Sequence, residues 1–168
     1  MIEQPLNTEY IPYFDLYISL VKDDPLTVLT EQQNEVIGWL KNYPVEKLDL
    51  GYAVGKWSPK DLIQHIIDTE RIFCFRALSF ARGDQQVFPG FNENDYADAV
   101  ITKAKTLEGL CHEYRSQRES TLAIFKSFTT DELKIIGNTS GGKMSVRALL
   151  YILAGHDLHH FNVLRDRY

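Results

Sequence analysis

Histidine is concentrated near one end of this 168-residue chain. Three of its five histidines, His156, His159 and His160, fall within the six-residue segment GHDLHH. Imidazole is the commonest side-chain metal ligand, and it suits zinc, nickel and iron alike. Two imidazoles spaced four residues apart on a helix share one face and can bind the same ion. His156 and His160 have this spacing, so the segment predicts part of a metal site if it is helical.

The pattern around these histidines predicts a final helix that runs from about Ser145 to the C-terminus. Its buried stripe is marked by apolar residues at helical spacing: Val146, Leu149, Leu150, Leu153, Val163 and Leu164. Each residue of a helix advances about 100°, so His156 and His160 lie on this stripe and face the interior. His159 borders the stripe, and we expect it at the rim of the site.

A third inward-facing imidazole is predicted within the segment WSPKDLIQHIIDTERIFCFRALSFARGD, residues 57–84. Ser58 can cap a helix there, with Pro59 at its first position and Asp61 completing a capping-box pattern. His65 lies three positions after Leu62, the first residue of the apolar stripe, and therefore leans inward. We expect it to face the last helix across a helical bundle.

Three imidazoles from two helices would leave one position of a tetrahedral ion open to water or substrate. This is the arrangement of catalytic zinc sites, whereas structural sites are closed. The alternative is that these histidines are hydrogen-bonded core residues, which is the commoner role of an inward-facing histidine. Their spacing alone leaves the two interpretations open.

Besides Asp61 of the capping box, two carboxylates lie close to His65 along the chain. Asp68 follows it by one turn, and Glu70 lies further round the same helix. Either could orient a ligand imidazole through its second nitrogen, or act as a general base. The cysteines are not expected to take part, because Cys74 falls on the opposite side of the helix from His65 and Cys111 lies among apolar residues.

Two further amphipathic helices are predicted, one from Pro25 to just before Pro44 and one over residues 101–128. The segments between helices at residues 87–100 and 137–144 are rich in Gly, Asn and other turn-forming residues and are predicted to be connecting loops. Four long amphipathic helices without alternating strands indicate an all-α fold, a four-helix bundle.

The chain is expected to form one domain over residues 1–168, with the aromatic-rich segment 1–24 packing on the bundle. The apolar residues of this N-terminal segment exceed what a free tail needs, and we expect a homodimer.

The composition limits the classes of partner. Lysine and arginine number 18 and aspartate and glutamate 23, so the net charge is −5. An acidic chain without a basic run is a poor candidate for binding nucleic acid. The N-terminus lacks the pattern of a signal peptide, and the longest apolar run is too short to span a bilayer. We therefore expect a cytoplasmic protein that binds neither nucleic acid nor membrane.

Three segments together resemble a known family. They are KWSPKDLIQHIIDTERIFCFRAL at 56–78, ARGDQQVFPGFNENDY at 81–96 and SVRALLYILAGHDLHHFNVLRDRY at 145–168. They are similar to the DinB-like, YfiT-type superfamily of metal-dependent enzymes, and the resemblance covers about residues 25–168. It implies a four-helix bundle in which three histidines hold a divalent metal. On this chain those histidines are His65, His156 and His160.

The resemblance implies metal-dependent chemistry of two kinds, and a third function is open if the histidines are core residues. The first is a transferase in which the metal lowers the pKa of a low-molecular-weight thiol, and the resulting thiolate attacks an electrophile. The second is a hydrolase that uses metal-bound hydroxide. The third is a helical binding module without enzymatic activity. Zinc or nickel is the expected metal, with iron, cobalt or manganese as alternatives.

Overall fold

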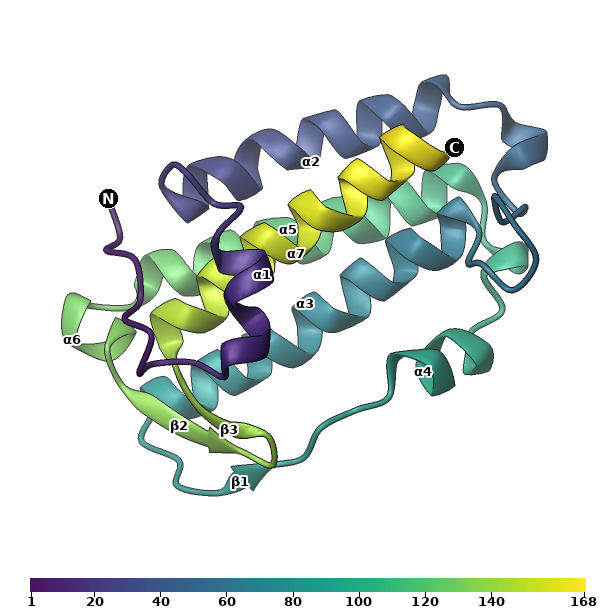
Figure 1. Ribbon diagram of the computed structural model, residues 1–168. Helices are drawn as coiled ribbons and strands as arrows, with labels where there is room; N and C mark the ends of the chain where they lie inside the picture. The colour runs from purple at the N-terminus through teal and green to yellow at the C-terminus, as the bar shows by residue number, and fades with distance from the viewer.

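The computed structural model of the protein describes residues 1–168 and is built on four long helices. They are α2 (Pro25–Asn42), α3 (Pro59–Ala81), α5 (Leu107–Ser127) and α7 (Val146–Arg167). Helices α2 and α3 each pack against both α5 and α7, and α7 runs through the middle of the view in Figure 1. The predicted all-α four-helix bundle is confirmed.

The caps of these helices follow the sequence signals in most places. Ser58 and Asp61 form the predicted capping box at the start of α3, and the Ser145 hydroxyl accepts a hydrogen bond from the third residue of α7. Asp24 precedes α2 but makes no cap, because its carboxylate accepts the backbone N–H of Ile2 at 2.8 Å. Helix α5 begins only at Leu107, later than predicted.

Short helical segments join the long helices. They are η1 (Pro12–Phe14), α1 (Asp15–Ile18), η2 (Val45–Lys47), α4 (Glu93–Ala99), η3 (Thr102–Ala104) and α6 (Thr130–Leu133). Helix α1 crosses over α7, and α4 lies beside α3 (Figure 1). No helix combines the length and the hydropathy that crossing a bilayer requires.

A small sheet corrects the prediction that the connecting segments are only loops. Strands β1 (Val87–Phe88), β2 (Ile136–Thr139) and β3 (Gly142–Ser145) form it in the order β1-β2-β3. β1 pairs with β2 in parallel, and β2 and β3 form a hairpin whose two-residue turn is Ser140–Gly141. Most residues of β2 and β3 are glycine or polar residues, most of which are depleted in strands, so the sequence did not indicate these strands.

The N-terminal segment is part of the core. Ile18 is fully buried, and Val21 is 5% exposed. The Glu9 carboxylate accepts hydrogen bonds from Ser145 and Arg147, which ties this segment to the start of α7. Other apolar residues of the segment, among them Leu6, Tyr13 and Leu16, remain exposed. The homodimer stays a prediction.

Candidate metal centre

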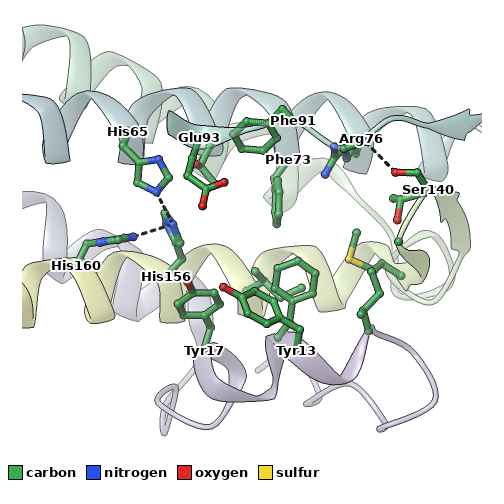
Figure 2. A pocket seen from close by; sticks show the side chains of 18 of the residues that line it. Tyr13, Tyr17, His65, Phe73, Arg76, Phe91, Glu93, Ser140, His156 and His160 are labelled. Carbon is green, nitrogen blue, oxygen red and sulfur yellow. Dashed lines mark hydrogen bonds between the residues drawn. The ribbon is translucent and has the colours of Figure 1, made fainter. Parts of the chain in front are cut away.

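Three imidazoles meet at the middle of the bundle. The Nε2 atom of His156 lies 3.0 Å from Nε2 of His65 and 3.0 Å from Nε2 of His160. His65 comes from α3 and the other two from α7, and Figure 2 shows their rings pointing toward one another. The candidate ligand atoms all lie within 4.8 Å of each other, so the cluster could hold a metal ion. The structure thus brings together the three residues that the sequence singled out.

The donor set fits a divalent cation better than a network of hydrogen bonds. An imidazole nitrogen has either one proton or one lone pair in the ring plane, so it makes one good hydrogen bond. His156 Nε2 has two close neighbours of the same kind. Nitrogen ligands of a tetrahedral zinc ion, each about 2.0–2.1 Å from the metal, are about 3.3 Å apart. This is close to the 3.0 Å that separates His156 Nε2 from each of the other two Nε2 atoms.

The surroundings keep these imidazoles neutral, which is the form that binds metals. Burial lowers the pKa of His65 to about 4 and that of His160 to about 3. Burial also lowers the pKa of His156 well below its usual range, and the neighbouring histidines lower it further. The Nδ1 atom of His160 is buried without a hydrogen-bond partner.

Aromatic rings flank the cluster. The Trp57 ring lies 4.9 Å from the His65 ring, and the Tyr17 ring lies 5.3 Å from the His156 ring. His159 also contacts Tyr17, and its imidazole is half-buried outside the cluster. The prediction that His159 lies at the rim agrees with this position. These rings shield the imidazoles from water on two sides.

Of the two carboxylates considered from the sequence, Asp68 lies near the cluster but does not hydrogen-bond to it. Its Oδ1 accepts hydrogen bonds from Gln64 at 3.0 Å and from Arg71 at 3.2 Å. Its charge favours protonated His65 and so opposes part of the fall in the His65 pKa. Asp68 therefore acts on the site through its charge.

Glu70 lies elsewhere, in a buried ionic network. Both of its carboxylate oxygens accept hydrogen bonds from Arg118 of α5, at 3.0 and 3.1 Å. Arg118 is fully buried and also donates to Asp157 at 2.7 Å and to the carbonyl oxygen of Leu29 at 2.8 Å. The Tyr114 hydroxyl donates to the same Asp157 oxygen. This network, the Arg118 network, joins all four long helices, so we assign Glu70 to the framework.

The Arg118 network bears directly on the orientation of the metal cluster. Asp157 is the neighbour of His156 in sequence, and it is held by Tyr114 and Arg118 of α5, whereas His156 faces His65 of α3. Burial alone would lower the pKa of Arg118, but the charges of Glu70, Tyr114 and Asp157 raise it well above its usual value. A permanently charged Arg118 fixes Asp157, and this limits rotation of α7 about its axis.

Glu93 is the acidic residue that the sequence analysis missed. It is the first residue of α4, and its side chain enters the cavity beside the imidazoles (Figure 2). Its charge is the largest influence that raises the pKa of His65 against the effect of burial. Glu93 lies 28 positions after His65, in a polar segment. The one local sign of a helix there is Asn92, which caps α4 directly before Glu93.

The three imidazoles form one end of a cavity of about 360 Å³. Phe73 and Phe91 line its middle, and Arg76 and Ser140 lie at the other end (Figure 2). This volume is in the range of sites for small molecules. Neither cysteine lines the cavity, and burial raises the pKa of the Cys74 thiol to about 12.

The sequence model of the DinB superfamily matches residues 29–164, which is most of the chain. The chain belongs to the DinB superfamily. The match includes all three histidines of the cluster. No curated protein sequence matches the chain significantly.

Solved structures with the same fold include two proteins of Bacillus subtilis. YfiT, described as a probable metal-dependent hydrolase with an unusual four-helix bundle topology, has a TM-score of 0.74 and 15% identity, over 98% of this chain and 90% of YfiT. The DinB-like protein YjoA has a TM-score of 0.60 and 19% identity, over 85% of this chain and 88% of YjoA.

A mycothiol-dependent maleylpyruvate isomerase is also similar, with a TM-score of 0.67 and 12% identity over 93% of this chain. The match spans 66% of the isomerase, which is a longer protein. At these levels of identity the likeness shows the fold that this DinB-superfamily chain shares with the three proteins. The chemistry must be argued from its own residues.

Proposed function

We propose that this DinB-superfamily protein is a divalent-metal-dependent transferase that joins a low-molecular-weight thiol to a small electrophile. His65, His156 and His160 hold the metal, which is zinc or nickel by preference and iron, cobalt or manganese otherwise. One observation carries the proposal: three neutral imidazoles converge through Nε2 at the end of a cavity of small-molecule size. A divalent ion bound there lowers the pKa of a thiol or a water molecule at its open position.

The residues around the cluster have separate tasks in this proposal. Glu93 stands at the same end of the cavity, where its carboxylate can accept the proton that the thiol loses. Trp57 and Tyr17 cover the imidazoles, which keeps water from competing for the reacting groups. The sulfur then forms a bond to the electrophilic carbon, and the leaving group departs with its bonding electron pair.

The nucleophilic sulfur must come from a bound molecule. Cys74 and Cys111 are both buried outside the cavity, and burial raises the pKa of each thiol. A protein thiolate is thus unavailable to a substrate in the cavity. The similar isomerase is named as mycothiol-dependent, which supports a small thiol as a substrate class for this fold.

Hydrolysis is the second candidate. It is supported by the similar YfiT, which is described as a probable metal-dependent hydrolase, and by the same open metal position. In that case Glu93 would take a proton from water, and no thiol would be consumed. A binding module without enzymatic activity is the third alternative, and it requires no turnover at all.

The test uses full-length protein purified without a histidine tag and loaded in turn with zinc, nickel, cobalt, iron or manganese. One panel offers cellular thiols with a chromogenic aryl halide, and a second offers esters and amides without thiol. Metal-dependent conjugation that is lost in His156→Ala and kept in His112→Ala supports the transferase, since His112 is exposed on α5. Metal-dependent hydrolysis without thiol would replace it with the hydrolase, and no turnover in either panel would favour the binding module.

A further inference from the structure

Arg76 is a buried cation without an anionic partner. Three arginines of the chain are buried: Arg76 is 7% exposed, Arg118 fully buried and Arg147 6% exposed. Arg118 pairs with Glu70 and Asp157, and Arg147 pairs with Glu3 and Glu9. Arg76 makes no salt bridge, although the chain carries an excess of acidic residues. A buried charge is normally paired, so its place in the cavity calls for an explanation.

The protein holds the Arg76 guanidinium in one position without neutralising it. Its Nη2 atom donates to the carbonyl oxygen of Pro89 at 2.6 Å, and its Cζ atom lies 5.3 Å from the centre of the Phe73 ring. The Nε and Nη1 atoms make no hydrogen bond within the protein. Burial lowers the pKa of Arg76, and no acidic group offsets this effect. The guanidinium thus keeps donors free, in the planar arrangement that matches a carboxylate.

These free donors belong to the same cavity as the imidazoles but lie at its other end. Arg76 follows His65 by 11 positions on α3, which is close to three helical turns. The two residues therefore share a face, with Cα atoms about 16 Å apart along the axis. Figure 2 shows Phe73 and Phe91 between them and Ser140 beside Arg76. Ser140 lies in the hairpin turn, where its Oγ atom accepts the Gly90 N–H at 2.9 Å.

We propose that Arg76 binds a carboxylate of the substrate, and that the substrates are elongated molecules with a reactive atom at one end and a carboxylate at the other. The aromatic middle of the cavity then contacts an apolar segment between the two ends. This inference rests on the proposed function, because it takes the imidazole end of the cavity as the reacting end. The carboxylate is carried either by the thiol or by the electrophile.

Calorimetric titration of the metal-loaded full chain tests this with two matched pairs of probes. Phenylbutyrate and phenylbutyramide lack a thiol, whereas mercaptoundecanoate and mercaptoundecanol carry one. We expect the carboxylate of at least one pair to bind about tenfold more tightly than its neutral analogue. A preference within the first pair alone assigns the carboxylate to the electrophile, and a preference within the second pair alone assigns it to the thiol.

Variants of Arg76 show whether the carboxylate binds to Arg76 or to the metal. Arg76→Gln should abolish the carboxylate preference and leave the neutral analogues unchanged. Arg82→Gln is the control, because Arg82 is exposed near the end of α3 and pairs with Glu132. If circular dichroism shows that Arg76→Gln is unfolded, Arg76→Lys decides, and a preference reduced at least about threefold supports the proposal, since lysine lacks the planar fork.

Equal binding of carboxylate and neutral probe to the wild type would overturn the proposal. So would a preference that survives in folded Arg76→Gln or is unchanged in Arg76→Lys, because the metal would then be the receptor. Loss of the preference alongside intact thiol conjugation would overturn this inference only. A preference that depends on Arg76, in a protein that conjugates no thiol, would overturn only the proposed transferase.

Discussion

The Nε2 atoms of His65 and His156 lie 3.0 Å apart, although the two residues are 91 positions apart in sequence. The contact joins α3 to α7, and His160 completes it from one turn further along α7. If these atoms share one metal ion, each imidazole is indispensable. Loss of any one leaves two ligands, which is a weak site.

We expect His65→Ala, His156→Ala and His160→Ala each to weaken metal binding by more than about 100-fold. Replacing even the outer partners of metal ligands costs about 10–100-fold. His159→Ala is the control, because its imidazole lies against Tyr17 outside the cluster. Elemental analysis after dialysis against a competing chelator measures the effect. Equal metal retention in His160→Ala and the wild type, with loss in His159→Ala, would mean that the ligand set is wrong.

The stability of the metal-free protein should depend on these imidazoles between about pH 4 and 6.5. Burial lowers the pKa of His65 to about 4 and that of His160 to about 3, whereas an unfolded imidazole has a pKa of about 6.5. In this window the unfolded chain binds protons that the folded chain does not. The free energy of unfolding therefore falls as pH falls, on the order of 3 kcal/mol for one such group.

Urea unfolding in the presence of a chelator, at steps of pH from 7 to 4, measures this dependence. The variant His65→Gln/His160→Gln should lose less stability than the wild type over that range, while His112→Gln on the exposed face of α5 should follow the wild type. Parallel curves for the double variant and the wild type would show that these imidazoles are not buried as neutral groups.

Removal of the Glu70 charge should lower the stability of the protein, whereas removal of the Glu93 charge should lower the rate of conjugation. Glu70→Gln leaves Arg118 with one anionic partner in a fully buried network and should cost about 3–5 kcal/mol of stability. Glu93→Gln, exposed at the start of α4, should leave the melting temperature unchanged. If Glu93 is the base, its variant should lower the rate of conjugation by about 100-fold or more, with metal content unchanged.

Asp68→Asn completes this comparison. In the wild type, the Asp68 carboxylate accepts hydrogen bonds from Gln64 and Arg71 and makes none to the imidazoles. We expect a small effect on both stability and rate. Thermal unfolding and single-turnover rates on the same preparations separate the three roles. A folded Glu70→Gln variant that loses conjugation while Glu93→Gln keeps it would return Glu70 to the site.

The features that the sequence predicted are those with a local or periodic signal. The capping box at Ser58 and Asp61 uses residues three positions apart, and the inward direction of His156 follows from the apolar stripe of its own helix. His65 could be paired with α7 because inward-facing imidazoles on two helices of a small bundle have few other places to meet. Local rules sufficed wherever the partner lay on the same helix or in the same core.

The features that were missed depend on contacts between segments far apart in sequence. From its position on α3 alone, Glu70 could lie beside the imidazoles or within the buried framework. Only its ion pair with Arg118 of α5 places it in the framework. Glu93 reaches the imidazoles because of how its polar connecting segment folds back on α3. The hairpin of β2 and β3 was hidden because Gly137 packs under the Phe80 ring, a contact that no strand propensity encodes.

Gly155, next to His156, is the position at which α1 crosses α7. A Cβ atom added there would overlap the backbone carbonyl of Tyr17, which cannot move without moving α1. We expect Gly155→Ala to destabilise the protein by about 1–3 kcal/mol or more, despite the higher helix propensity of alanine. The displacement should also reach the metal cluster, because the Tyr17 ring packs on the His156 ring.

Gly38 provides the matched control, because it lies within α2 and a Cβ atom added there would meet nothing within 4 Å. Gly38→Ala should stabilise the protein by about 0.5–1 kcal/mol through helix propensity alone. Urea unfolding of both variants, with metal content measured on the same samples, checks the pair. If Gly155→Ala were as stable as Gly38→Ala and bound metal normally, α1 would not rest on α7 at this point, and the packing that orders Tyr17 against the imidazoles would be wrong.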